Sequence, residues 1–507
     1  MNGAKSKSGL VIAGLLLAIL MASMDNTIVA TAMGTIVGEL GGLNHFVWVT
    51  AAYMVAEMAG MPIFGKLSDM YGRKRFFVFG IILFMIGSVL CGMAGSIVEL
   101  SIYRAIQGIG AGALVPITFT IIFDAVSPEN RGKLMGLFGA VFGLSSVFGP
   151  LLGAFITDYI SWQWIFYINL PLGILSLTLV FKGYNESLIL SKQKIDWLGA
   201  VTLVGSVVCL MFALEFGGKL FAWDSWQLVS LLAGFVVLGC LFVAAEKKAA
   251  EPIISFDMFK VRLFASSTVI AILSGAAFIG ASVYLPIFIQ GVLGGSATNS
   301  GLMLLPMMVG TVITATLGGF AMAKLTYRTI MISTLVLLVA GLGLLTTISM
   351  DTSRFLITMY MIIVGLGIGA SFSVLSNAAI QCVSPAQRGA ATSTLNFLRS
   401  FGMMLGITVF GILQSSSMTR KLEESFQGGE GSIPQGLDLK DPYVLMDSTV
   451  RSSIPDGVLS GLLKGVSSSI TDVFLWGLIP AVLAVGAACF MGREKHDPKA
   501  EMEAYGH

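Results

Sequence analysis

Long apolar stretches separated by short polar segments run along almost the whole chain. Each stretch has about 20 residues or more, the length that an α-helix needs to cross the hydrocarbon core of a bilayer. The apolar residues are continuous and do not alternate with polar ones, so the pattern predicts spanning helices and not the strands of a membrane barrel. The predicted spans cover residues 10–32, 46–67, 76–95, 97–123, 134–157, 164–182, 197–217, 227–245, 263–290, 299–323, 329–349, 355–379, 390–413 and 470–492.

The composition agrees with a helical membrane protein. The chain has 507 residues, of which 55% are hydrophobic and 11% charged, whereas a soluble protein has about 25% charged residues. This excludes a soluble enzyme, a fibrous protein and a disordered chain. The net charge of +2 gives no reason to expect a nucleic-acid partner. The five cysteines are scattered and the three histidines lie outside the apolar runs, so we expect no metal, no cofactor, no disulfide framework and no intramembrane enzyme.

The basic residues predict the orientation of the chain. The short loops on the side of the N-terminus carry about ten times more Lys and Arg than the short loops on the other side, and such an excess marks the cytoplasmic face. An even number of spans puts both termini on that face. A long segment at about 414–469 then lies outside, as a solvated loop or as a cap over the outer mouth.

The chain contains an internal repeat. The heptapeptide Val126–Gly132 returns with two changes as Val383–Gly389, and the glycine-rich stretch Gly108–Gly112 returns as Gly365–Gly369. The two members of each pair are separated by the same number of residues and have the same orientation. This predicts two halves related as parallel repeats about an axis along the membrane normal.

The repeat divides the chain into predicted units. Residues 1–184 form a six-helix bundle, and residues 263–492 form a second one that includes the long outer loop. Residues 185–262 contribute two inserted helices between the bundles, and residues 493–507 form a cytoplasmic tail. The predicted fold is therefore all-α and polytopic, with a central cavity between two bundles.

The cytoplasmic loop after the second span combines glycine, acidic and basic residues. Gly65 allows a close helix approach and Gly72 a turn at positive φ. Asp69 can pair with Arg73 and with a nearby helix N-terminus. Together with Lys74, these residues predict a latch that closes the cytoplasmic side in one state. The alternative is a simple positively charged anchor.

Three charged residues lie well inside predicted spans of the first half, away from the span ends. Arg104 and Asp25 each lie about seven residues, or roughly 10 Å, from the outer end of their span. A lone charge in a membrane is costly, so opposite charges at equal depth predict an ion pair. The alternative for Arg104 is a side chain that extends to the outer interface. Glu57 lies in the middle of the second span.

The fifth span carries small residues at regular spacing. Small residues on one helix face permit close contact with a neighbouring helix, and a proline bends the helix. Generic packing of small residues is the alternative to a specialised function. The residues concerned are Gly139, Gly143, Gly149, Pro150 and Gly153.

These motifs resemble those of the major facilitator superfamily. The latch loop is similar to its G-x-L-x-D-R-x-G-R-R/K signature, departing at Met70, and the fifth span resembles its antiporter motif G-x3-G-x5-GP-x2-GG, departing at Ala154. Met24–Ala30 and Trp162–Pro171 resemble stretches of the fourteen-span drug:proton antiporter-2 family. Arg399 resembles that family's arginine in span 13.

The resemblance implies the fold and the function. The expected fold is that of the superfamily, with fourteen helices. The expected function is export of lipophilic, often cationic drugs in exchange for protons, by alternating access, in the plasma membrane of a bacterium. The antiporter motif implies a leak-proof seal between the halves. The partners would be drugs or dyes, protons and lipid, and the chain would work as a monomer. The alternative is a proton-coupled symporter of a small nutrient on the same fold.

Glu57 departs from the family, in which this position is commonly apolar. At helical spacing, Tyr53, Met54 and Met61 share its face. This predicts a proton carrier that also meets cationic drugs. The alternative is a permanently protonated structural acid. With Arg399, the same three neighbours are candidates for the lining of the cavity.

Overall fold

The computed structural model describes residues 8–41, 47–126, 128–186, 196–218, 220–249, 251–294, 297–384, 387–426 and 456–495. Within these ranges the chain forms fourteen rods of membrane-spanning length, one of which is made of two consecutive helices. Twelve of them meet criteria of length and hydropathy for a span within the described residues, and α2 and α5 complete the set. The helices are α1 (Ser8–Leu40), α2 (Val47–Tyr71), α3 (Arg73–Gly92), α4 (Ile97–Ala125), α5 (Pro128–Tyr159), α6 (Trp164–Tyr167) with α7 (Asn169–Gly183), α8 (Trp197–Phe216), α9 (Trp226–Glu246), α10 (Arg262–Ile287), α11 (Ala297–Ala321), α12 (Tyr327–Leu345), α13 (Arg354–Gln381), α14 (Arg388–Phe426) and α16 (Asp456–Cys489).

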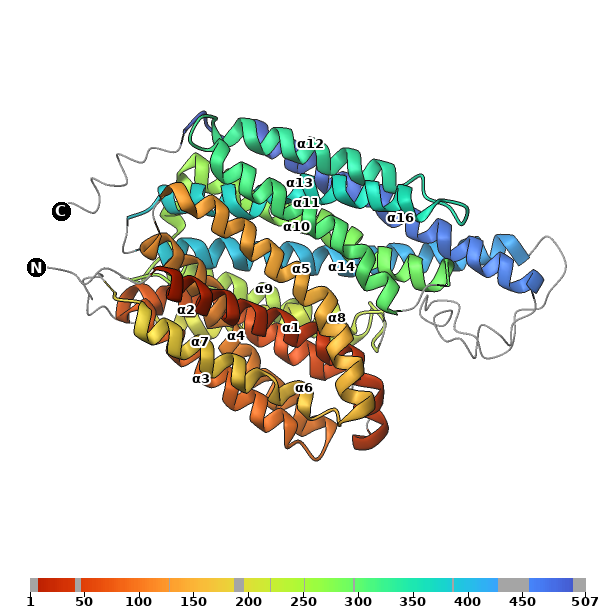
Figure 1. Cartoon of the computed structure of the whole chain (residues 1–507), viewed down its shortest axis with the longest axis horizontal. Coiled ribbons are helices and arrows are strands. Elements are labelled where there is room, and N and C mark those ends of the chain that lie inside the picture. Colours follow the sequence, from red (N-terminus) through yellow and green to blue (C-terminus); the bar gives the residue numbers. More distant parts are fainter. Residues whose placement is uncertain are drawn as a thin grey trace, which may run out of the picture.

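Two helical bundles lie side by side (Figure 1). The described ends of the chain emerge at the same end of the molecule. The bundles meet at that end and diverge toward the other. The largest hydrophobic core is made only of residues between Met258 and Met491, and the cores of the first bundle are made of residues up to Tyr184, with Ile380 as one contribution from the second bundle.

The repeated glycines show that both halves use the same packing. A side chain at Gly108 of α4 would clash with the backbone oxygen of Tyr53 in α2, and one at Gly365 of α13 would clash with that of Met307 in α11. The pairs α2–α4 and α11–α13 are therefore equivalent, and each is held by close backbone contact that only glycine permits.

Helices α14 and α16 reach further than the apolar runs that predicted them. The predicted outer loop at about 414–469 is helical up to Phe426 and again from Asp456, and residues 427–455 lie outside the described part of the chain. The role of that segment as a loop or a cap stays a prediction.

Polar contacts between α14 and α16 explain this difference. The Gln414 amide donates to Ser469 Oγ at 3.1 Å, and Lys421 forms an ion pair of 2.5 Å with Asp472. Polar residues that pair across two helices can extend both helices beyond their apolar parts. A hydropathy pattern does not detect such pairs, because it considers one residue at a time.

The inserted helices α8 and α9 pack on the side of the molecule where α2 and α14 meet. One hydrophobic cluster joins Val55 and Met58 of α2, Leu203 of α8 and Phe397 of α14, with Phe242 of α9. The insert thus touches both halves.

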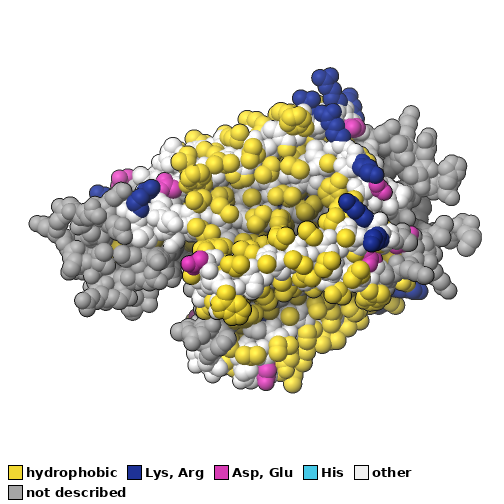
Figure 2. Space-filling model, turned by 180° about the vertical axis from the view of Figure 1, so that it is seen from behind, with side chains coloured by type: hydrophobic (Ala, Val, Ile, Leu, Met, Phe, Trp, Pro, Cys, Tyr) yellow, Lys and Arg dark blue, Asp and Glu magenta, His cyan; other side chains and the backbone are white. Residues whose placement is uncertain are grey.

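The surface fits a bilayer. Figure 2 shows a broad band of hydrophobic side chains across the middle of one face of the molecule, with Lys and Arg on this face gathered mainly near the end that carries the termini. Large apolar side chains such as Trp226, Val236 and Leu475 are more than half exposed, which is expected where lipid tails are the solvent.

Candidate functional site

Asp25 and Arg104 form a completely buried ion pair between α1 and α4. The guanidinium also donates to Gln107 Oε1 at 2.6 Å and lies 4.1 Å from the centroid of the Tyr53 ring. The structure therefore brings together the two residues that equal depth had matched. Arg104 has no exposed surface, so its side chain does not extend to the outer interface.

Neutral polar groups complete the surroundings of Asp25. Its Oδ1 accepts a hydrogen bond of 2.8 Å from Gln107 and one of 2.8 Å from Asn169 of α7. Both donors also contact Ser88 Oγ, at 2.8 and 3.3 Å. Sequence reasoning missed Ser88, Gln107 and Asn169. Gln107 had a readable signal, because it lies one helical turn after Arg104, and Asn169 lies in the stretch Trp162–Pro171 that resembles the family.

This arrangement constrains what Asp25 can do chemically. Breaking a buried ion pair by removing the charge of one partner leaves the other uncompensated, at a cost of about 3–5 kcal/mol. The charge of either residue is therefore stabilised by the presence of the other.

Glu57 is the contrasting acid. It lies on α2 and is partly exposed, and within the described residues no hydrogen bond or ion pair involves its carboxylate. Its predicted neighbours do not surround it as one pocket. Tyr53 is fully buried beneath Arg104, Met54 is 42% exposed, and Met61 packs into the cluster that joins α2 to α8 and α14. Residues at helical spacing share one broad face of α2, but different neighbouring helices cover different parts of that face. Tyr53, Met54 and Met61 therefore have different surroundings.

Arg399 of α14 is buried without a carboxylate partner among the described residues. It donates to Asn396 Oδ1 and to the backbone oxygen of Ser371, both at 3.0 Å, and its guanidinium lies 4.8 Å from the centroid of the Phe372 ring. Neutral dipoles and an aromatic face therefore replace a counter-charge inside the second bundle.

Asp69 joins the two halves at the cytoplasmic end. Its carboxylate accepts hydrogen bonds from the backbone N–H groups of Gly389, at 2.9 Å, and Ala390, at 2.8 Å, in the first turn of α14. Arg73 donates to the same carboxylate at 3.2 Å. The partial positive charge of a helix N-terminus favours a carboxylate at this place. An acid of α2 thus caps a helix of the other half.

Two further contacts involve this end of α2. A side chain at Gly65 would clash with Ser393 of α14, so the glycine permits the close approach of the two halves. Lys66 forms an ion pair of 2.9 Å with Glu251, which follows the inserted helices. The cytoplasmic end of α2 therefore contacts both the second half and the insert.

The rest of the loop is held within the first half. Gly72 has a φ of 111°, a conformation that favours glycine, and Glu186 accepts a hydrogen bond from the backbone N–H of Arg73. Lys74 donates to the backbone oxygens of Phe181, at 2.7 Å, and Tyr184, at 2.8 Å. These groups fix the loop against the end of α7. Sequence reasoning had no signal for Glu186.

The described small residues of α5 face α1. A side chain at Gly149 would clash with Thr27, and one at Gly153 with Thr31, while the Thr27 hydroxyl donates to the backbone oxygen of Ser145 at 3.0 Å. This contact lies inside the first half, whereas the motif had implied a seal between the halves. Helix α5 does meet the second half, through α11.

The other residues of the antiporter motif also belong to α5. Pro150 lies inside α5. Gly139 and Gly143 also belong to this helix, but their surroundings lie outside the described part of the chain.

Comparisons with known proteins agree with this architecture. Residues 15–407 match the model of the Major Facilitator Superfamily. Multidrug resistance protein 3 of Bacillus subtilis (strain 168) is 54% identical over 494 residues, which cover 97% of this chain and 96% of the relative. Multidrug transporter protein MdtP of the same organism is 37% identical over 504 residues, covering 96% and 93%.

Solved structures share the fold at low sequence identity. The human organic anion transporter MFSD10 (TETRAN) aligns with a TM-score of 0.58 and 15% identity, over 94% of this chain and 98% of that one. The proton:xylose symporter XylE aligns with a TM-score of 0.59 and 15% identity, over 99% of both. With its long apolar helices and its close relatives, this multi-pass protein of the cell membrane belongs to the Major Facilitator Superfamily.

Proposed function

We propose that the protein exports lipophilic, often cationic compounds in exchange for protons, by alternating access. The names of the two relatives from Bacillus subtilis support a role in drug efflux. The observation that carries the proposal for the mechanism is Glu57, a partly exposed carboxylate without a partner among the described residues, on a helix that also contacts the buried Asp25–Arg104 pair.

The proposed exchange takes place at Glu57. In the ionised form this acid stabilises a lipophilic cation, and in the protonated form it does not, so that a proton and a cation compete for one site. Exchange of one proton for one monovalent cation moves no net charge, so the membrane potential does not drive it, and a difference of one pH unit supplies about 1.4 kcal/mol, or a tenfold concentration ratio. A single carboxyl is therefore enough to drive accumulation against a gradient.

The other groups have supporting roles in this proposal. Asp25 and Arg104 couple a second protonation to a change of shape, because neither charge can be lost alone. Asp69 holds the cytoplasmic ends of α2 and α14 together and releases them when that side opens. Because both bundles and the insert belong to one chain, we further propose that a monomer is the transporting unit.

Transport in proteoliposomes tests the proposal. The purified chain is reconstituted with a pH-sensitive dye inside, and ethidium is added with and without an imposed proton gradient. We expect ethidium to move against the proton flux and to discharge the gradient, and a protonophore to abolish uphill movement. Movement of substrate together with protons would instead show a symporter, and dye movement that ignores the gradient would contradict proton coupling.

A further inference from the structure

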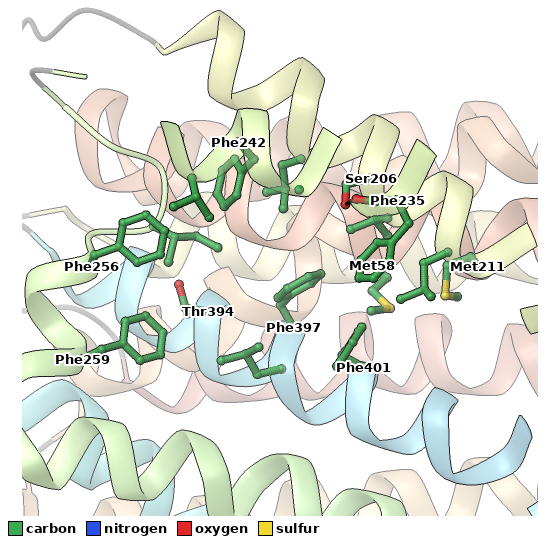
Figure 3. Close-up of a pocket in the computed structure, with 17 residues that line it drawn as sticks. Met58, Ser206, Met211, Phe235, Phe242, Phe256, Phe259, Thr394, Phe397 and Phe401 are labelled. Carbon is green, nitrogen blue, oxygen red and sulfur yellow. Dashed lines mark hydrogen bonds between the residues drawn. The ribbon is translucent and has the colours of Figure 1, made fainter. Parts of the chain in front are cut away.

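A cavity of about 290 Å³ lies where the inserted helices meet both halves. Helices α8 and α9 form one side, α14 the other, and residues of α2 and of the segment before α10 complete the walls. Six phenylalanines dominate the lining (Figure 3): Phe235, Phe242, Phe256, Phe259, Phe397 and Phe401.

The lining carries no charge. None of its residues is Asp, Glu, Lys, Arg or His. Glu57 is absent from the lining although its neighbour Met58 belongs to it, because adjacent residues of a helix point in different directions. A charged ligand would lose its hydration here without gaining a counter-charge, and that loss is large.

One hydroxyl in the lining has no partner. Of the two polar side chains, Ser206 donates to the backbone oxygen of Phe235 at 3.1 Å. Thr394 is 1% exposed, and its Oγ1 has no hydrogen-bond partner within the described residues. Figure 3 shows this oxygen pointing away from α14 into the space near Phe256. Leaving a buried hydroxyl unpaired costs about 1–3 kcal/mol, so an acceptor delivered by a ligand would relieve that cost.

We propose that this cavity binds an uncharged aromatic compound of two or three rings whose acceptor atom takes the hydrogen bond of Thr394. Apolar cavities of about 150 Å³ are known to bind benzene, so the volume suits a larger ring system. The phenylalanine rings supply edge and face contacts for such a ligand. The site is separate from the proposed exchange at Glu57 and does not depend on it.

Photolabelling with benzophenone tests the proposal directly. This probe is neutral, has two rings and an acceptor carbonyl, and on irradiation it inserts into nearby C–H bonds, with a preference for methionine. The full chain in lipid nanodiscs is irradiated with the probe, and the adducts are mapped by peptide mass spectrometry. We expect saturable labelling of Met58 and Met211, which both line the cavity.

Two variants and a matched control sharpen the test. Gly239→Leu fills the cavity from α9, where an added Cβ would meet only Ser206 Oγ at 3.4 Å, and should lower the labelling about tenfold. Gly486→Leu adds the same side chain on α16 where nothing lies within 4 Å, and should leave labelling unchanged. Thr394→Val keeps the shape and should weaken benzophenone binding about fivefold. Diphenylmethane, which lacks the carbonyl, should compete equally well in wild type and Thr394→Val.

Three results would overturn the proposal. Labelling that is spread over the lipid-facing surface, or that survives in Gly239→Leu, would show that the probe partitions into lipid only. Equal benzophenone affinity in wild type and Thr394→Val would remove the hydrogen bond from recognition. Native mass spectrometry that finds a phospholipid retained by wild type and lost in Gly239→Leu would assign the cavity to an acyl chain.

Discussion

Charged residues inside the spanning helices of this protein are compensated in different ways, and this separates their roles. Asp25 and Arg104 neutralise each other within a network of hydrogen bonds. Glu57 has no partner within the described residues, and Arg399 has only neutral ones. A compensated charge is costly to change alone, whereas an uncompensated acid is free to meet a proton or a cation.

The Asp25–Arg104 pair leads to a prediction that separates stability from transport. Asp25→Asn leaves Arg104 buried and unpaired, and should lower the free energy of unfolding by about 3 kcal/mol. The double variant Asp25→Asn with Arg104→Gln removes both charges and should recover most of that loss, as measured by thermal unfolding in detergent. Proton-driven efflux should be absent from both variants. Normal drug resistance in the stable double variant would exclude the pair from coupling.

Glu57→Gln tests charge selection at the unpaired acid. It keeps the size of the side chain and fixes the neutral state. Efflux of monovalent cationic dyes should fall about tenfold or more, since the lost attraction to a cation in a partly desolvated site exceeds about 1.4 kcal/mol. Efflux of neutral compounds should fall much less.

Glu57→Asp is the matched control, because it is shorter but keeps the charge, and it should retain the preference for cations. Equal losses for both classes of compound in Glu57→Gln would favour a structural or purely proton-carrying acid. No loss for either class would leave Asp25 as the candidate carrier.

The sequence predicts how deep a residue lies in the membrane, but it does not predict which residues of other helices it contacts. Equal depth was enough to match Asp25 with Arg104, because depth follows from the position in a span. The donor Asn169 comes from α7, which is distant along the chain, and only the packing of helices shows that it reaches Asp25. The same packing separates Met54 from Met61.

Helices α2 and α14 form one of the contacts between the halves, on the cytoplasmic side. At this end the contact is made by the Asp69 carboxylate and by Gly65, which lies one helical turn before it. Apolar side chains such as Met58 and Phe397 continue the contact between the two helices, so the carboxylate is the polar part of a larger interface.

Asp69→Asn should weaken this contact. Hydrogen bonds to a charged group contribute about 1.5–3 kcal/mol, so the amides of Gly389 and Ala390 should exchange with deuterium about tenfold faster or more, as followed by mass spectrometry of the peptide that contains them. Transport should slow while drug binding persists. Asp257→Asn, at an exposed pair with Lys260, serves as the control and should change neither. Reduced drug affinity with intact turnover in Asp69→Asn would point to substrate contact instead.

The contact between α1 and α5 gives a second prediction at this scale. Gly149→Ala places a methyl group against Thr27, and overpacking of this kind costs about 1–3 kcal/mol. We expect slower transport in Gly149→Ala and partial recovery when Thr27→Gly is added, both measured as dye efflux from cells. A defect that Thr27→Gly does not relieve would show that Gly149 acts through another neighbour.

The spanning elements were predictable, since a run of apolar residues and its length follow directly from the solvent that surrounds it. All fourteen predicted spans have a matching rod among the described residues. The outer extensions of α14 and α16 were not predictable, because Gln414 and Lys421 are polar and their partners lie on another helix.

The whole molecule consists of two equivalent bundles with an insert at one side. The composition and the repeat were enough to predict this plan, because they report the solvent and the symmetry of the chain. The side on which the insert packs was not predictable, because it depends on the apolar faces that α2 and α14 leave between them.

The topology itself is open to a direct test. An epitope tag inserted between Gly428 and Gly431, in the predicted outer segment, should bind antibody on intact cells. The same tag at the C-terminus should bind only after permeabilisation, because the basic loops hold both termini inside. Antibody binding to the C-terminal tag on intact cells would reverse the orientation.

The contact between the inserted helices and the two halves is apolar, and this has a consequence for how the insert can be gained or lost. The faces that α2 and α14 turn toward α8 and α9 are made of side chains such as Val55, Met58, Phe397 and Met404, and lipid tails solvate such side chains as well as a protein does. A hairpin of two helices placed between the halves therefore demands few matching substitutions in either of them. Such a hairpin can therefore be gained or lost in a single insertion or deletion while the packing inside each bundle stays unchanged.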